Sequence, residues 1–265
     1  MLIYDSHIHY GDPELTEIIA AESPLREKFP CYRTFQHWNM TDYPKLLDRA
    51  QIEKAALIPF VFAEHDKSFE SLRVIKFAGS RPGLFPYALL DEDNIDFVAK
   101  HRSSVAGVKE HIVLHKSELN PKRKEIFAQI KEYGMNLLLH SWSDKRVEYV
   151  RAIQDNFPGM KIQVAHLGRD GSGDPKFIYH ILESLASFES VFFDTSTVRS
   201  SEVLEKAIDI VGSDRILYGS DFPFYMDKEG KEDIIQEQIE HVLRANLSDE
   251  VKEKLMYKNF DVYYV

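Results

Sequence analysis

The chain alternates short apolar runs with segments of helical periodicity, and this order constrains the fold more than any other feature. The runs are rich in β-branched and aromatic residues, as strands are. They lie at Leu2–Asp5, Ala55–Phe60, Leu84–Leu89, Ser103–Glu110, Asn136–His140, Lys161–His166, Ser190–Thr195 and Arg215–Tyr218. Strand and helix repeated in this way predict a parallel (β/α)8 barrel, the TIM-barrel fold of the α/β class. Pro59 and Pro86 make the second and third strands the weakest predictions, because proline cannot donate to a sheet.

Helix signals between these runs support the same order. Asn120 followed by Pro121 predicts a helix N-terminus, and Gly134 predicts the end of that helix. Residues 144–157 carry apolar side chains at helical spacing. Ser248 is a candidate N-cap for a terminal helix.

The length of 265 residues allows either one barrel or two smaller domains. No linker rich in Ser, Gly or Pro divides the chain, so one domain spanning residues 1–265 is expected. The irregular stretch at about 11–41 is interpreted as an insertion after the first strand. A doubly wound open sheet is the alternative fold, but it usually begins with a glycine-rich turn. The chain has Ser6-His7-Ile8-His9 at that position.

Charge and cysteine content exclude several classes of protein. The 33 basic and 43 acidic residues give a net charge of −10, which argues against a nucleic-acid partner. The single cysteine, Cys31, excludes an internal disulfide and suits a reducing compartment. The longest apolar run, residues 55–63, is far shorter than the roughly 20 residues of a membrane helix, and no signal peptide is visible. A cytoplasmic protein without a membrane partner is expected.

Polar residues with metal-ligand chemistry follow several strands, at the end where a barrel builds its active site. The first strand leads into His7 and His9, whose i, i+2 spacing points both side chains to one side of an extended chain. His140, His166 and Asp221 end the fifth, sixth and eighth strands. One such histidine is more often an ordinary hydrogen-bonding residue, but this group at one end of a barrel predicts a metal site. Imidazole and carboxylate ligands without thiolates favour zinc and also admit manganese, iron or cobalt.

These residues resemble the amidohydrolase superfamily, and in particular its branch of metal-dependent hydrolases related to aminocarboxymuconate-semialdehyde decarboxylase. The resemblance runs from residue 2 to about 260. The matching segments are Asp5-Ser6-His7-Ile8-His9, Gly107-Val108-Lys109, His166-Leu167-Gly168, Gly219-Ser220-Asp221-Phe222-Pro223 and the closing helix that leads to Asn259. The resemblance implies that His7, His9 and Asp221 hold one metal. His140 and His166 would hold a second, or, in a single-metal site, one of them would be a ligand and the other would serve catalysis.

The end of the fourth strand, Lys109-Glu110-His111, bears on the number of metals. In two-metal members of the superfamily this strand supplies a bridging carboxylate, either a carbamylated lysine or a glutamate. The tandem Lys109-Glu110 is similar to the phosphotriesterase homology proteins, in which glutamate bridges. Glu110 is therefore the favoured bridge, and carbamylated Lys109 is the alternative. In the remaining interpretation, Lys109 or His111 only contacts substrate.

Four more residues near the expected barrel mouth are candidate substrate contacts: Trp142, Arg169, Arg199 and Tyr225. The two arginines could hold a carboxylate or phosphate by paired hydrogen bonds, or could form ordinary surface salt bridges. The loop Gly168–Gly173 could be a lid, a phosphate-binding turn or a plain flexible loop.

The resemblance implies a hydrolase that cleaves a C–N, ester or lactone bond in a small molecule, using water activated on one or two divalent metals. Asp221 would be the proton shuttle. A decarboxylase of the same branch is the nearest alternative. A TatD-type deoxyribonuclease is disfavoured by the negative charge, and a barrel that binds metal only for structure is a further alternative. Barrels of this size often pair, so a homodimer is also expected.

Overall fold

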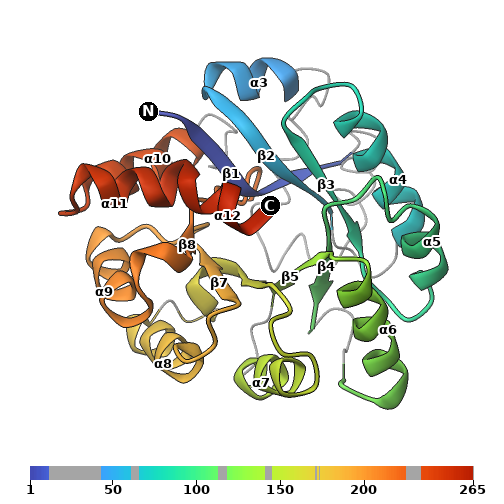
Figure 1. Cartoon of the computed structure of the whole chain (residues 1–265). Coiled ribbons are helices and arrows are strands. Elements are labelled where there is room, and N and C mark those ends of the chain that lie inside the picture. The colour runs from blue at the N-terminus through green and yellow to red at the C-terminus, as the bar shows by residue number, and fades with distance from the viewer. Residues whose placement is uncertain are drawn as a thin grey trace.

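Eight strands follow one another in chain order around a parallel sheet, within the part of the chain that the structure describes (Figure 1). This computed structural model describes residues 1–11, 43–60, 66–112, 118–140, 145–170, 172, 174–224 and 234–264. The strands are β1 (Ile3–Tyr10), β2 (Ile52–Pro59), β3 (Leu84–Leu89), β4 (Gly107–His111), β5 (Asn136–His140), β6 (Ile162–Val164), β7 (Val191–Asp194) and β8 (Ile216–Leu217). Beside β8, the Ser6 N–H donates to the Tyr218 carbonyl at 2.9 Å and brings the sheet round on itself. The predicted (β/α)8 barrel is confirmed.

Helices lie outside the ring of strands, except the C-terminal helix, which lies across one end of the barrel (Figure 1). They are α3 (Tyr43–Arg49), α4 (Lys67–Ala78), α5 (Ile95–Lys100), α6 (Pro121–Glu132), α7 (Arg146–Asn156), α8 (Pro175–Leu185), α9 (Ser201–Val211), α10 (Ile234–Arg244), α11 (Asp249–Glu253) and α12 (Asn259–Tyr264), with short turns η3 (Ala165–Gly168) and η4 (Ser213–Arg215) and a π-helical segment, η5 (Lys254–Lys258). Asn120 caps α6 as predicted, because its side chain accepts the Arg123 N–H at 2.8 Å. Ser248 likewise accepts the Val251 N–H at 3.3 Å at the start of α11.

Alternation along the strands separates an outer apolar layer from the barrel interior. In β5, Leu137 and Leu139 belong to the large cluster shared with the helices, whereas Leu138 belongs to a smaller cluster with Tyr4 and Phe260. Successive side chains of a strand face opposite sides of the sheet. The residue after Leu139 is His140, which by this alternation faces the interior, as Leu138 does.

The C-terminal helix α12 covers one end of the barrel, and the chain ends near the middle of the strand ring in Figure 1. Phe260 packs edge-on against Tyr4, with ring centroids 5.5 Å apart. The hydroxyl of Tyr264 is 3.0 Å from that of Tyr87 on β3. Since these aromatic residues fill one end, the polar strand ends at the opposite mouth are the place for a functional site.

The ends of β1 and β6 differ from the prediction in ways that affect the candidate site. β1 continues to Tyr10, so His7 and His9 lie inside the strand, beside a register shift between Asp5 and Ile8. β6 ends at Val164 because His166, with a φ of 60°, and the next residue both adopt left-handed backbone conformations. β4 also begins later than predicted, since residues 101–106 form turns and irregular backbone.

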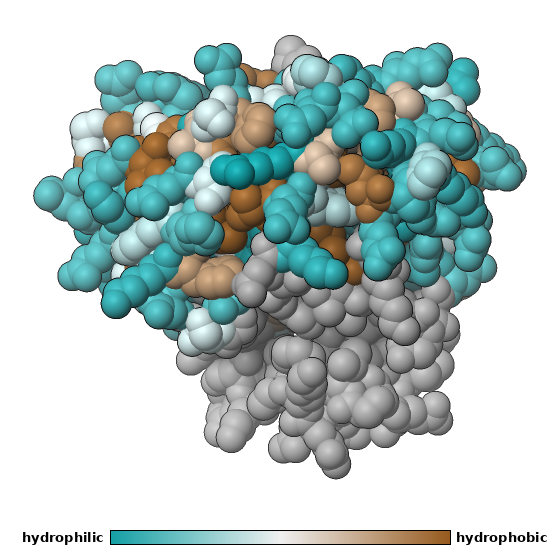
Figure 2. Space-filling view, turned by 90° about the horizontal axis from the view of Figure 1, so that it is seen from below, coloured by the Kyte–Doolittle hydropathy of each residue, from teal (hydrophilic) through white to brown (hydrophobic). Residues whose placement is uncertain are grey.

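The described surface is mostly hydrophilic in the view of Figure 2. The large hydrophobic residues that the described part exposes are Met1, Leu2, Phe69, Leu243 and Val262. No helix of the described residues has both the length and the hydropathy of a membrane span. The insertion predicted at about 11–41, including Cys31, lies outside the described residues except for Gly11.

Candidate metal centre and active site

Two histidines of β1 and one aspartate after β8 converge at the mouth of the barrel. His7 Nε2 is 3.3 Å from Asp221 Oδ1, and His9 Nε2 is 3.2 Å from the same oxygen. All three residues are buried. Asp221 has a φ of 58°, and its N–H donates to the His7 carbonyl at 2.7 Å, so the backbone itself fixes its carboxylate beside β1. The structure brings these three predicted ligands together as a group that could hold a metal ion.

The protonation states of this group suit a cation. Burial lowers the pKa of His9 to about 4, so its ring is neutral at pH 7. Burial alone would raise the pKa of Asp221, but the imidazoles of His166, His7 and His9 outweigh it and hold that pKa well below its ordinary value. Nitrogen lone pairs and a carboxylate oxygen therefore face one another at short range, and they repel unless a positive charge lies between them. The donor set, imidazole and carboxylate without thiolate, fits a divalent ion such as zinc.

Three more histidines extend the group across the mouth toward β4. The ring of His166 lies 5.2 Å from that of His7, and His166 Nε2 is 3.2 Å from His140 Nδ1. The ring of His140 in turn stacks on that of His111 at 4.3 Å. Burial lowers the pKa of His166 to about 3 and holds that of His140 well below its ordinary value. Both rings are thus neutral, and they contact each other beside the convergence point on Asp221.

Lys109 on β4 places its ammonium group against one of the predicted metal ligands. Its Nζ is 3.2 Å from His7 Nε2, and the residue is buried. Burial lowers the pKa of Lys109 to about 8, so most molecules still carry the ammonium at pH 7. The centre therefore contains a buried cation that the chain itself supplies.

The position of Glu110 argues against the hypothesis that this residue bridges two metals. Its Oε1 accepts a hydrogen bond from the Tyr149 hydroxyl at 3.0 Å and lies 3.2 Å from Arg123 NH1. These partners belong to α7 and α6, outside the barrel. Val108 belongs to the outer apolar cluster, and Glu110, two residues later, faces the same side because strand side chains alternate.

The predicted substrate contacts fall in different places. Arg169 follows the turn that carries His166, and its positive charge contributes to the lowered pKa of that ring. Arg199 pairs with Glu237 on α10 at 3.6 Å, and both side chains are 40% exposed, which matches the surface salt bridge that the sequence left open. Trp142 and Tyr225 lie outside the described residues, as do two glycines of the Gly168–Gly173 loop.

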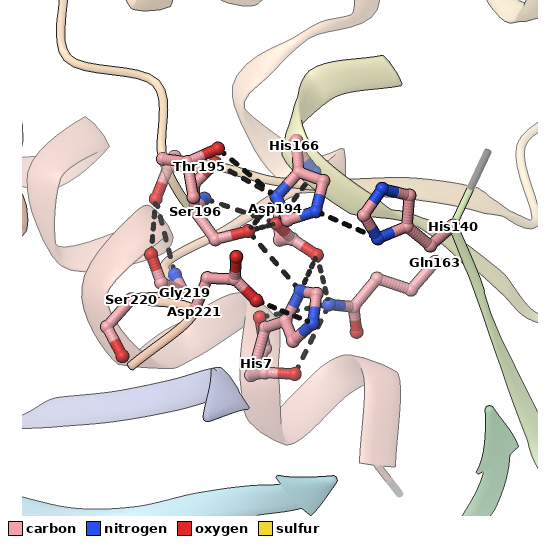
Figure 3. A network of polar contacts seen from close by, with 12 residues as sticks. His7, His140, Gln163, His166, Asp194, Thr195, Ser196, Gly219, Ser220 and Asp221 are labelled. Carbon is pink, nitrogen blue, oxygen red and sulfur yellow. Dashed lines mark hydrogen bonds and ion pairs between the residues drawn. The ribbon is translucent and has the colours of Figure 1, made fainter. Parts of the chain in front are cut away.

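Sequence reasoning missed Asp194, the last residue of β7. Its carboxylate lies directly behind the histidines, with Oδ2 3.1 Å from His7 Nδ1 (Figure 3). Together with His7 and His166, it forms a second group of side chains close enough to hold a metal ion. The signal was present in the sequence, because Val191–Asp194 is an apolar strand that ends on a carboxylate, the same pattern that identified His140.

Comparison with known proteins adds a family to this geometry. The family model for the amidohydrolases matches residues 4–259. Among solved structures, a putative 2-pyrone-4,6-dicarboxylic acid hydrolase from Pseudomonas putida has a TM-score of 0.73 at 19% identity, covering 99% of this chain and 97% of that one. A 2,6-dihydroxybenzoate decarboxylase from Rhizobium has a TM-score of 0.68 at 17% identity, covering 99% and 98%. An IDCase from Metarhizium anisopliae has a TM-score of 0.69 at 16% identity, covering 99% and 97%. A search of curated protein sequences finds no match.

Proposed function

The chain belongs to the amidohydrolase family, and we propose that it is a hydrolase that uses one divalent metal to cleave a C–N, ester or lactone bond in a small molecule. The observation that carries the proposal is the convergence of His7 Nε2 and His9 Nε2 on Asp221 Oδ1, at 3.3 and 3.2 Å, in a buried mouth of the barrel. A divalent ion held by these residues, zinc by their chemistry, supplies Lewis acidity that polarises a carbonyl and makes water more acidic.

The side chains around this point have complementary tasks. The Asp221 carboxylate is ionised at neutral pH and can accept a proton from the attacking water, then deliver it to the leaving group. The Lys109 ammonium, 3.2 Å from His7 Nε2, can donate a hydrogen bond to negative charge that develops on the substrate oxygen. His140 and His166 are neutral and border the same space, so they can contact a substrate without adding charge.

A decarboxylase is the second candidate function. The orientation of Glu110, away from the metal centre, is compatible with the single metal that a decarboxylase would need. With the Glu110 carboxylate bonded to Tyr149 and Arg123, β4 offers no glutamate bridge for a second metal. A single ion beside the Lys109 ammonium could equally hold a substrate carboxylate. Substitution of Glu110 cannot separate the two reactions, because neither would use that side chain.

The two reactions differ in the fate of solvent oxygen and of carbon dioxide. We expect the zinc-loaded protein, given a panel of small lactones, esters, amides and aromatic carboxylic acids in ¹⁸O-labelled water, to place the label in one product without releasing carbon dioxide. Protein stripped with a chelator is the control and should lose this activity. Carbon dioxide release without label in the remaining product would assign the chain to the decarboxylases. Equal rates with and without metal would contradict both assignments.

A further inference from the structure

The two carboxylate oxygens of Asp194 have separate sets of donors. Oδ1 accepts the backbone N–H groups of His166 at 2.9 Å and Ser196 at 3.1 Å, and also the Ser196 hydroxyl. Oδ2 accepts from Gln163 Nε2 at 2.7 Å and lies 3.1 Å from His7 Nδ1 (Figure 3). One buried side chain therefore joins β1, β6 and the end of β7 behind the candidate metal centre.

A carboxylate only accepts hydrogen bonds, and this constrains the ring of His7. The oxygens of Asp194 accept two backbone N–H groups, the Ser196 hydroxyl and the Gln163 amide, which is the environment of an ionised carboxylate. His7 Nδ1 must then carry the proton that Asp194 accepts. The lone pair of Nε2 is left facing Asp221. The Lys109 ammonium, 3.2 Å from that nitrogen, is a donor and agrees with this arrangement.

Asp194 lies close enough to His7 and His166 for the three side chains to hold a metal ion. The hydrogen bonds that Asp194 accepts argue against a role as a metal ligand. Both of its oxygens already accept hydrogen bonds, two of them from backbone N–H groups that cannot turn away. A cation between Asp194 and His7 would have to displace the 3.1 Å contact that joins them.

We infer that Asp194 is a positioning residue that fixes His7 in the tautomer whose Nε2 can bind a metal. Through Ser196, whose hydroxyl is 2.7 Å from His166 Nδ1, it also orients the ring of His166. The inference deepens the proposed function and rests on it for the identity of the metal site, but not for the type of bond cleaved. Histidine ligands commonly donate their second N–H to a carboxylate in this way, and loss of such a partner typically weakens metal binding about 10–100-fold.

The variant Asp194→Asn has a predictable effect on this tautomer. The amide oxygen must take the place of Oδ1, because the two backbone N–H groups there need an acceptor. The amide NH₂ then faces His7 Nδ1 and Gln163. Gln163 can turn its Oε1, which has no hydrogen-bond partner among the described residues, toward the NH₂. Opposite that NH₂, His7 presents its Nδ1 lone pair, which moves its proton to Nε2 and blocks metal binding there.

The test uses zinc alone and no substrate. ¹⁵N NMR of the imidazole rings reads the tautomer of His7 in metal-free and zinc-loaded wild-type protein, and chelator competition measures the dissociation constant for zinc. We expect the Nδ1–H tautomer in wild type, the Nε2–H tautomer in metal-free Asp194→Asn, and zinc binding about 10–100-fold weaker in that variant. Thr195→Val is the matched control: it alters the same strand end, where Thr195 Oγ1 accepts the Gly219 N–H at 3.2 Å, and should leave the tautomer of His7 unchanged.

The wild-type spectrum alone can overturn the inference, so a failure of Asp194→Asn to fold does not protect it. An Nε2–H tautomer in wild type would contradict it, as would Asp194→Asn protein that binds zinc as tightly as wild type. If the wild-type protein shows the Nδ1–H tautomer and binds zinc but hydrolyses no substrate, the proposed hydrolase function is contradicted and this inference is unaffected.

Discussion

Lys109 and Glu110 are neighbours in sequence, but their charged groups lie on opposite sides of the sheet and interact with different partners. Lys109 brings a cation into the metal centre, where its Nζ contacts His7 Nε2. Glu110 neutralises Arg123, which is 2% exposed, in the layer between the strands and α6. A buried charge without a partner is strongly destabilising. Glu110 is thus expected to stabilise the fold rather than bind metal.

Replacing Glu110 with Gln tests this division. The change keeps the shape of the side chain but removes the charge opposite Arg123, so we expect the free energy of unfolding to fall by about 1–3 kcal/mol. Zinc content should be unchanged, because the carboxylate faces away from the histidines. Urea unfolding and elemental analysis measure the two effects.

Tyr149→Phe is the matched control for Glu110→Gln, since it removes one hydrogen bond from the same carboxylate without touching its charge. It should cost about 1 kcal/mol. Loss of metal from Glu110→Gln with no change in stability would restore the bridging hypothesis.

At the scale of elements, the turn between β6 and α8 is held in one conformation by several contacts. His166 has a φ of 60° and Gly168 a φ of 75°. Arg146 on α7 holds the turn from behind, with NH1 donating to the Arg169 carbonyl at 2.9 Å. A Cβ on Gly168 would lie only 2.5 Å from Ile181 Cγ2 on α8, so this position requires glycine for both its conformation and its space.

Gly168→Ala should therefore destabilise the protein by about 2–4 kcal/mol, from the left-handed conformation and the overlap together. Gly134→Ala is the control: Gly134 has a φ of 67°, but a Cβ added there would meet none of the described residues within 4 Å. It should cost only about 1–2 kcal/mol. Equal losses for the two variants in thermal or urea unfolding would show that contact with Ile181 has no effect.

Local patterns explain which of these elements could be predicted. Apolar runs and the capping residue Asn120 act over a few residues, so the order of strands and the ends of α6 follow from sequence. The left-handed turn at His166 does not, because it depends on an acceptor 28 residues away, Asp194 Oδ1. The convergence of His7 and Asp221 was expected only because parallel strands of a barrel bring their ends together.

For Glu110, the resemblance to the amidohydrolase superfamily favoured a role as metal bridge, whereas the alternation of side chains along its strand indicated the opposite face. The alternation Val108, Lys109, Glu110 places the lysine and the glutamate on opposite faces, and the apolar Val108 marks the outer one. That alternation would have directed Glu110 away from the metal. Asp194 could have been found by the strand-end pattern, but its many hydrogen bonds follow from the fold alone.

For the whole molecule, the buried imidazoles predict acid sensitivity of the metal-free protein. His9 and His166 have pKa values lowered from 6.5 to about 4 and about 3, and that of His140 is also lowered. Between those values and 6.5 the unfolded chain binds more protons than the folded one, so stability falls as the pH drops from 6.5 toward 4. Asp5 has the opposite effect, because burial raises its pKa from 3.8 to about 7. Its contribution to the stability of the folded protein is lost as the pH rises through that range.

The three imidazoles outweigh the one carboxyl, so we expect the free energy of unfolding to fall by about 1–3 kcal/mol per pH unit between pH 6.5 and 4.5. Urea unfolding of chelator-treated protein at several pH values measures this slope. His9→Gln should reduce it. A stability that stays constant or rises on acidification would contradict the assignment of neutral, buried rings.

The number of zinc ions bound per chain tests the central claim most directly, that His7, His9 and Asp221 form a single metal centre. Protein purified without chelator, or stripped and reloaded with zinc, should hold one equivalent by elemental analysis. Asp221→Asn should lose it, whereas Asp209→Asn, at an exposed carboxylate on α9, should keep it. Two equivalents, or less than about a tenth of one even after zinc, manganese, iron or cobalt is added, would contradict the account.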